Sequence, residues 1–389
     1  MLQMKYQLSV CALALSGALA WGGFTAHADH RRDDRDDRHD QRARKVFVIA
    51  MENHNWTQPS TQTSPQPIFR NPSAPFINSL VNGTSGISEE VAYATNYLNA
   101  GPGIHPSEPN YIWAEAGTNF GVLNDDQPYH ADCSPDTVQT TSQHLSAFLT
   151  RARKTWRSYQ EDTDVDSNNV PLIQSQWTVP LFNLSGLFTS GFNAYHYSKQ
   201  YNYAAKHNPM VFFTDTNGGC DTTASNSKRL QYAPLQQLAL DLQNDKVADY
   251  NWITPDQFND QHTALSGGWG YQTGDSAQIL QGDNFLSRIV PLIMASDAYK
   301  DHGVIVLWWD ESEGGDDPSR TLPFIIISRD AHENVGGVPY ASPIDYSHSS
   351  FLRTMQEIFR VDPRTGYSWL GAASTAFNLS DLFKPGSIE

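Results

Sequence analysis

Three short, unbroken runs of apolar residues constrain the fold of this chain more than any other feature. They cover residues 46–51, 303–309 and 322–328. Strands that are buried on both faces of a parallel sheet have this pattern, whereas half-exposed strands alternate apolar and polar side chains. Weaker strand signals lie at 211–213 and 249–253. The sequence therefore predicts a sheet whose central strands are covered on both sides.

Helical patterns lie between these predicted strands. We expect helices over residues 141–156, 235–243, 284–298 and 349–359. Strands that alternate with helices indicate an α/β fold, doubly wound, with helices on both faces of a mostly parallel sheet. In such sheets ligands bind at the carboxyl ends of the strands, so residues that directly follow a strand are the first candidates for a functional site.

Composition and charge narrow the possible functions. The 389 residues are 39% hydrophobic, which is enough for a sizeable core. The formal net charge of −16 argues against a nucleic-acid-binding protein, because such proteins neutralise phosphates with a basic face. Phosphate substrates are still compatible with this charge, since bound cations would reverse the local field.

The N-terminal residues are typical of an exported protein. We expect a signal peptide over residues 1–28, with an apolar run at 8–21 and a cleavage site at Ala28. Residues 29–44 alternate Asp and Arg and predict a disordered tail, so the folded domain is expected over 45–389. No later run is long enough to cross a bilayer, which predicts a periplasmic or extracellular protein with no transmembrane segment once mature.

Cysteine usage agrees with export. Cys11 is removed with the signal peptide, and Cys133 and Cys220 remain as an even pair. In an oxidising compartment such a pair is expected to form a disulfide bond.

Acidic and amide side chains follow two of the predicted strands directly. Glu52 and Asn53 come after the first run, and Asp310 and Glu311 come after the second. Two such clusters at equivalent strand ends can converge on one ion. Oxygen ligands suit hard cations such as Ca²⁺, Mg²⁺ or Mn²⁺, and Zn²⁺ is a further option.

Ser107 is the candidate nucleophile. It precedes Pro109 and a helical run over 111–116. A serine at a helix start lies near unpaired backbone N–H groups that also attract phosphate. An isolated serine of this kind is more often a plain helix cap, and it is the two acidic strand ends and the neighbouring His105 that favour the catalytic interpretation.

Three histidines lie in loops beside polar residues. They are His207, His262, which follows Asp260 by two positions, and His348. Each could protonate a leaving group, bind a phosphate oxygen or hold a second metal ion. Spacing in the sequence does not assign these roles.

Several stretches resemble one known family. They are VFVIAMEN, HPSEPNYIWAEAG, WRSYQED, KHNP, YNWITPDQFNDQH, GDNFLSRIVPLI, VIVLWWDE and YSHSSFLRTMQEIF. In this order they resemble the phosphoesterase family that unites phosphocholine-type phospholipases C with a group of acid phosphatases, a branch similar to the alkaline phosphatase superfamily. The resemblance runs from about Lys45 to Phe383 and implies a doubly wound core with a transiently phosphorylated serine or threonine.

The resemblance also implies roles for individual residues. Residues 107–110 resemble the superfamily's nucleophile turn, which makes Ser107 the nucleophile and a metal ligand beside the two acidic strand ends. Asp260, with His262 and His348, resembles a second cluster, and His105 and Asn110 are candidates for phosphate binding. The chain departs from the pattern at Glu52-Asn53, where Asp-Gly is usual, and at Asp310-Glu311, where Asp-His is usual. This departure favours one hard ion over two zinc ions.

The sequence thus predicts an exported, metal-dependent phosphoesterase that works through a phosphoserine. Small phosphate monoesters are the expected substrates, because no C-terminal lipid-binding domain is evident. The first alternative is a phospholipase C that cleaves the phosphodiester of a phospholipid headgroup. The second is a non-catalytic exported protein that binds phosphate or metal. The sequence does not predict an oligomeric state.

Overall fold

The structure is a computed structural model that describes residues 45–130, 132–162, 203–221, 225–265 and 267–388. The predicted signal peptide and charged tail lie outside these residues. The described residues belong to one compact unit. Within the described part of the chain, no helix combines the length and the apolar character needed to cross a membrane.

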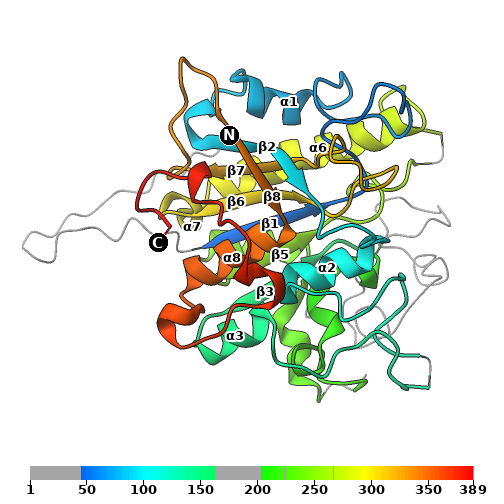
Figure 1. Ribbon diagram of the computed structural model, residues 1–389, viewed down its shortest axis with the longest axis vertical. Coiled ribbons are helices and arrows are strands. Elements are labelled where there is room, and N and C mark those ends of the chain that lie inside the picture. Colours follow the sequence, from blue (N-terminus) through cyan, green and yellow to red (C-terminus); the bar gives the residue numbers. More distant parts are fainter. Residues whose placement is uncertain (1–44, 131, 163–202, 222–224, 266, 389) are drawn as a thin grey trace, which may run out of the picture. The chain divides into compact units, whose positions relative to one another are not determined.

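Eight strands form one sheet in the order β4-β3-β5-β1-β6-β7-β2-β8 (Figure 1). Only β7 runs antiparallel to its neighbours, and every other neighbouring pair is parallel. The predicted mostly parallel sheet is confirmed. The strands are β1 (Val46–Met51), β2 (Val91–Leu98), β3 (Trp156–Gln160), β4 (Tyr232–Pro234), β5 (Tyr250–Thr254), β6 (Val304–Trp309), β7 (Phe324–Ser328) and β8 (Tyr340–Ser347).

Helices cover both faces of this sheet. In Figure 1, α8 passes in front of the strands with α2 and α3 beside it, and α6 lies behind them. The α-helices are α1 (Pro75–Asn82), α2 (Ser107–Ala116), α3 (Leu145–Arg151), α4 (Thr214–Asn217), α5 (Gln236–Gln243), α6 (Asp275–Met294), α7 (Asp297–Lys300) and α8 (His348–Phe359). The 3₁₀-helices are η1 (Ser88–Glu90), η4 (Ala205–His207), η5 (Pro209–Phe212), η6 (Ser227–Gln231), η7 (Pro363–Thr365), η8 (Gly371–Ser374) and η9 (Ser380–Leu382).

The core lies on the central strands. Every residue of β1, β5, β6 and β7 is buried, as the unbroken apolar runs predict for β1, β6 and β7. Trp252, Trp308 and Trp309 are the largest of the fully buried side chains. The carboxyl ends of β1, β5 and β6 therefore meet at one edge of the sheet, and a rigid core holds them there.

One strand prediction is wrong, and four strands were not predicted. Residues 211–213 do not form a strand: Pro209 starts the 3₁₀-helix η5, because proline fixes the backbone angle that opens a helical turn. The strands β2, β3, β4 and β8 gave no unbroken apolar run. Polar residues such as Thr95, Asn96 and Arg157 interrupt them, and β4 and β8 form the two edges of the sheet.

Two helix predictions also differ from the structure. The helix expected over 141–156 is limited to α3, because the chain turns at Arg153, which has a positive φ of 59°, and then enters β3. The helix expected over 284–298 begins earlier, at Asp275, and gives way to α7 after Met294. Polar residues in the first turns of α6 hid its start.

Cys133 and Cys220 form a disulfide bond, as the sequence predicts. The two residues are 87 positions apart. Closing a loop of this length stabilises the folded state by about 4–5 kcal/mol in the chain-entropy model.

Candidate active site

The two acidic strand ends lie side by side, because β1 and β6 are neighbouring parallel strands. Met51 pairs with Trp309, so Glu52 and Asp310 leave the sheet at the same level. The backbone N–H of Asn53 donates a hydrogen bond of 3.1 Å to Asp310 Oδ1. Glu52, Asp310 and Glu311 are all buried. The structure brings together the metal-binding residues that the sequence predicts.

Ser107 faces this acidic pair from the first position of α2. Its Oγ lies 3.1 Å from Glu52 Oε2 and 3.2 Å from Glu311 Oε1. The hydroxyl has one proton and can donate to only one of these carboxylates at a time. A buried oxygen shared by two carboxylates therefore needs a cation or an extra proton beside it.

The donor atoms around Ser107 fit a hard metal ion. Two buried oxygens among them, Asn53 Oδ1 and Asp310 Oδ2, accept no hydrogen bond. Asn53 is oriented by its amide nitrogen, which donates 2.9 Å to Glu313 Oε1, so its oxygen is free to act as a ligand. Unpaired buried acceptors are costly unless something compensates them. Carboxylate, amide and hydroxyl oxygens are the ligand types that hard divalent cations prefer.

A second donor set lies next to the first. Ligand atoms of Glu52, His207 and Asp260 all lie within 4.8 Å of one another. His207 Nε2 is 3.2 Å from Glu52 Oε1, and its Nδ1 is 3.4 Å from Asp260 Oδ2. Neither approach has the geometry of a hydrogen bond, so both ring nitrogens are unpaired. The sequence left three roles open for His207, and this arrangement is compatible with one of them, the binding of a second metal ion.

The carboxyl groups of the site disfavour one another's charge. Burial raises the pKa of Glu52 well above its usual value, and the carboxylates of Asp310 and Asp260 raise it further. Burial, followed by the charge of Glu311, raises the pKa of Asp310 to about 8. Burial, followed by the charges of Lys206 and His262, lowers the pKa of His207 well below its usual value. This imbalance of negative charge is what one or more bound cations would offset.

His105 and His262 contact different residues of the site. His105 is hydrogen-bonded through Nδ1 to Glu311, and its Nε2 lies 2.9 Å from Asp316 Oδ1. The hydrogen bond to Glu311 is the main cause that raises the pKa of His105 to about 9. The ring of His262 lies 6.2 Å from that of His207, and its backbone N–H donates 2.7 Å to Asp260 Oδ1.

Two further candidates, His348 and Asn110, use their side chains to hydrogen-bond with the protein around the site. His348 Nδ1 accepts a hydrogen bond of 3.1 Å from Trp308 Nε1, the Tyr97 hydroxyl lies 3.1 Å from the same nitrogen, and Nε2 donates to the backbone oxygen of Asp310. Asn110 uses its amide on the backbone of the 100–106 loop, at Ala100, Ile104 and Pro106. Both side chains hold the loops that carry Asp310 and Ser107.

Sequence reasoning gave no role to two residues that the structure places at the site. Tyr111 lies one turn after Ser107 on α2, donates a hydrogen bond to Glu52 Oε1 and stacks on the ring of His207. The four-residue spacing from Ser107 was an available signal, since it places both side chains on one helix face. Lys206 forms an ion pair with Asp125. The two are 81 positions apart, and no pattern in the sequence links them.

A family model described as the Phosphoesterase family matches residues 23–362. The chain belongs to the phosphoesterase family. The predicted resemblance is thereby confirmed, and the chain is a hydrolase of phosphoric esters. The match covers each of the segments that carry Glu52, Ser107, His207, Asp260 and Asp310.

Individual relatives of this phosphoesterase are distant. A phosphatidylinositol-3-phosphatase of Mycobacterium tuberculosis is 26% identical over 77% of the chain and 74% of the relative. A phosphate-repressible acid phosphatase of Penicillium chrysogenum is 23% identical over 62% of the chain, but the match spans only 46% of that relative. A solved protein in the alkaline phosphatase superfamily from Vibrio parahaemolyticus aligns with a TM-score of 0.42 and 11% identity, over 87% of this chain and 72% of that one. A structural likeness at that level carries no information on activity.

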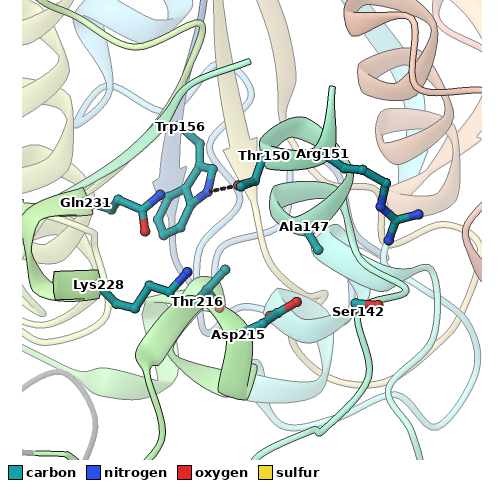
Figure 2. Close-up of a pocket in the computed structure, with 9 residues that line it drawn as sticks. All are labelled: Ser142, Ala147, Thr150, Arg151, Trp156, Asp215, Thr216, Lys228 and Gln231. Atoms are coloured by element: carbon teal, nitrogen blue, oxygen red, sulfur yellow. Dashed lines mark hydrogen bonds between the residues drawn. The ribbon is translucent and has the colours of Figure 1, made fainter. Parts of the chain in front are cut away.

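A separate pocket of about 240 Å³ lies at the amino-terminal end of β3, which begins at Trp156 (Figure 2). Lys228, Thr216 and Asp215 line it below the indole of Trp156. Asp215 also pairs with the buried His144, which contacts Glu115 in the last turn of α2. No residue of the candidate active site lines this pocket.

Proposed function

We propose that this phosphoesterase is an exported, metal-dependent phosphatase that hydrolyses phosphate monoesters through a phosphoserine at Ser107. The contacts of Ser107 Oγ with Glu52 and Glu311 carry the proposal, because a serine hydroxyl beside oxygens that can hold a metal ion is suited to act as a nucleophile. The names of the relatives support a monoester substrate, since a phosphatidylinositol-3-phosphatase and acid phosphatases are among them. The disulfide bond supports export.

In this proposal, residues of the chain bind the metal ion and activate the Ser107 hydroxyl. Glu52, Asn53, Asp310 and Glu311 would hold a divalent metal ion together with Ser107. When bound, such an ion supplies positive charge that stabilises the serine alkoxide and the phosphoryl oxygens. Glu52 and Glu311 orient the Ser107 hydroxyl, and one of the two accepts its proton as the oxygen attacks phosphorus in line.

Departure of the alcohol in the first step needs an acid, and hydrolysis of the phosphoserine in the second step needs a base. His262 is the side chain we assign to the leaving oxygen, because it is less buried than His207 and lies outside the first metal-ligand set. Burial lowers the pKa of His262 to about 4, so the protonated ring that gives a proton to the departing alcohol is populated at acidic pH. The resulting neutral imidazole then accepts a proton from the water that hydrolyses the phosphoserine.

The test is hydrolysis of p-nitrophenyl phosphate and bis-p-nitrophenyl phosphate by the mature protein, with and without chelator. We expect chelator-sensitive turnover that favours the monoester. Ser107→Ala should lower kcat by at least about 10³-fold, because the covalent route is lost. Ser287→Ala is the matched control, since Ser287 lies on α6 and its hydroxyl contacts only the helix backbone.

Three results would contradict parts of the proposal. Full activity of Ser107→Ala would exclude the phosphoserine. Preference for the bis-ester would favour the phospholipase C alternative. Tight binding of inorganic phosphate without turnover of either ester would indicate a binding protein.

A further inference from the structure

An ion pair lies beside the nucleophile helix and is not explained by the reaction described above. Lys206 Nζ is 2.6 Å from Asp125 Oδ2, and the Lys206 side chain is only 16% exposed. The other oxygen of this carboxylate, Asp125 Oδ1, accepts a hydrogen bond of 3.1 Å from the backbone N–H of Glu108. Asp125 thus links the ammonium group to the residue that directly follows Ser107.

The position of Lys206 along the chain brings its charge to the same cluster. Lys206 lies in η4 directly before His207, whose ring approaches Glu52 and Asp260. The ammonium group interacts electrostatically with the carboxylates of Glu52 and Asp310 as well as with Asp125. It is therefore a held cation at the edge of a strongly acidic site.

A cation in this position has a clear use if the site takes phosphate. An acidic site repels an incoming phosphate, and the repulsion is larger for a monoester dianion than for a diester monoanion. A lysine ammonium binds phosphate as a point charge with three donors, and Asp125 uses only one of them in the structure.

We propose that Lys206 is a specificity-determining residue whose ammonium binds a non-bridging oxygen of the substrate phosphate, and that Asp125 positions it. This inference rests on the proposed phosphatase function and adds the basis of its preference: the site selects substrates with a dianionic, terminal phosphate. Diesters lack the second charge and gain less from Lys206.

The experiment compares Lys206→Met, Lys206→Arg and Asp125→Asn with the wild type. Steady-state constants are measured for p-nitrophenyl phosphate and its bis-ester, together with the inhibition constant of inorganic phosphate. Lys154→Met is the matched control, because Lys154 is exposed and follows α3. Circular dichroism and urea unfolding check that each variant folds.

For Lys206→Met we expect KM for the monoester and the inhibition constant of phosphate to rise about 10–100-fold, the effect of losing one hydrogen bond to a charged group. The monoester-to-diester ratio of kcat/KM should fall by at least about tenfold. Lys206→Arg should restore most of the phosphate affinity and most of the monoester preference. For Asp125→Asn, both quantities should lie between those of the wild type and Lys206→Met.

An unchanged phosphate inhibition constant, or an equal loss on both esters, would overturn the proposal and leave Lys206 with a structural role. If Lys206→Met does not fold, Lys206→Arg and Asp125→Asn test the proposal. Binding of the substrate phosphate by Lys206 predicts a smaller monoester preference in Asp125→Asn. If the wild type hydrolyses neither ester, the proposed function fails separately. Calorimetric binding of inorganic phosphate to the wild type and Lys206→Met then tests whether Lys206 binds phosphate, and equal affinities would count against this role.

Discussion

Replacing Glu115 should destabilise the protein more than replacing any exposed carboxylate. Glu115 is fully buried in the last turn of α2. Its carboxylate accepts hydrogen bonds from His144 Nδ1 at 3.1 Å, from the backbone N–H of Ser146 at 2.9 Å and from Ser146 Oγ at 3.0 Å. On its other side, His144 Nε2 donates to Asp215 Oδ1 at 2.8 Å. The nucleophile helix is thereby joined to α3 and α4.

Two substitutions separate charge from hydrogen bonding. Glu115→Ala leaves a buried imidazole and the Ser146 N–H without their acceptor, and breaking a buried pair in this way costs about 3–5 kcal/mol. Glu115→Gln keeps an acceptor for Ser146 and an amide beside His144, so the loss should be about 1–2 kcal/mol, the difference between charged and neutral hydrogen bonds. The free energy of unfolding from urea denaturation gives both numbers.

The pH dependence gives an independent check. Burial lowers the pKa of His144, but the hydrogen bonds to Asp215 and Glu115 outweigh it and raise the pKa above its usual value. The stabilisation from the charged ring is then fully present below the unfolded pKa of about 6.5 and is lost as pH rises through the folded value. The difference between wild type and Glu115→Gln should therefore be largest near pH 6 and shrink at higher pH. A cost below about 1 kcal/mol for Glu115→Ala, or a difference that grows with pH, would refute this reasoning.

Three further predictions follow from contacts at and around the site. Tyr111→Phe removes the donor to Glu52 Oε1 and should lower kcat/KM for p-nitrophenyl phosphate about tenfold, with a loss of about 1–2 kcal/mol in the free energy of unfolding because a buried hydrogen bond is lost; an unaffected rate would show that this hydrogen bond does not orient Glu52. Replacing Cys133 and Cys220 with serine should lower the free energy of unfolding by about 4–5 kcal/mol while the folded enzyme keeps its kcat. A divalent ion at 100 times its Kd should stabilise the protein by about 2.7 kcal/mol, and Asp310→Asn should abolish this shift; a chelator without effect on the melting temperature would argue against a resident metal.

The central strands and the carboxylates that follow them could be predicted from the sequence for the same reason. Glu52 and Asp310 follow strands buried on both faces, so an unbroken apolar run marks both the strand and the exact edge at which its carboxylate emerges. Ser107 begins a helix, and its proline turn is visible in the printed sequence.

The remaining contacts depend on pairs that only the folded chain brings together. Lys206 of η4 pairs with Asp125 of a loop, and each residue alone is typical of a solvated surface. His348 was a candidate acid from its place at a helix start, but its partners come from β2 and β6 and use both ring nitrogens. The edge strands were missed because their packing is set by neighbours and not by an apolar run.

The strand that carries Glu52 also sets the order in which the protein can mature. Val46 pairs with Tyr250 on one side and with Val304 on the other, both more than 200 residues further along the chain. The first strand to be synthesised therefore has no partner until most of the polypeptide exists, and closing such long loops makes its insertion a late and slow event. A chain that is exported unfolded would cross the membrane before this strand is inserted, so catalytic competence would arise only at the destination.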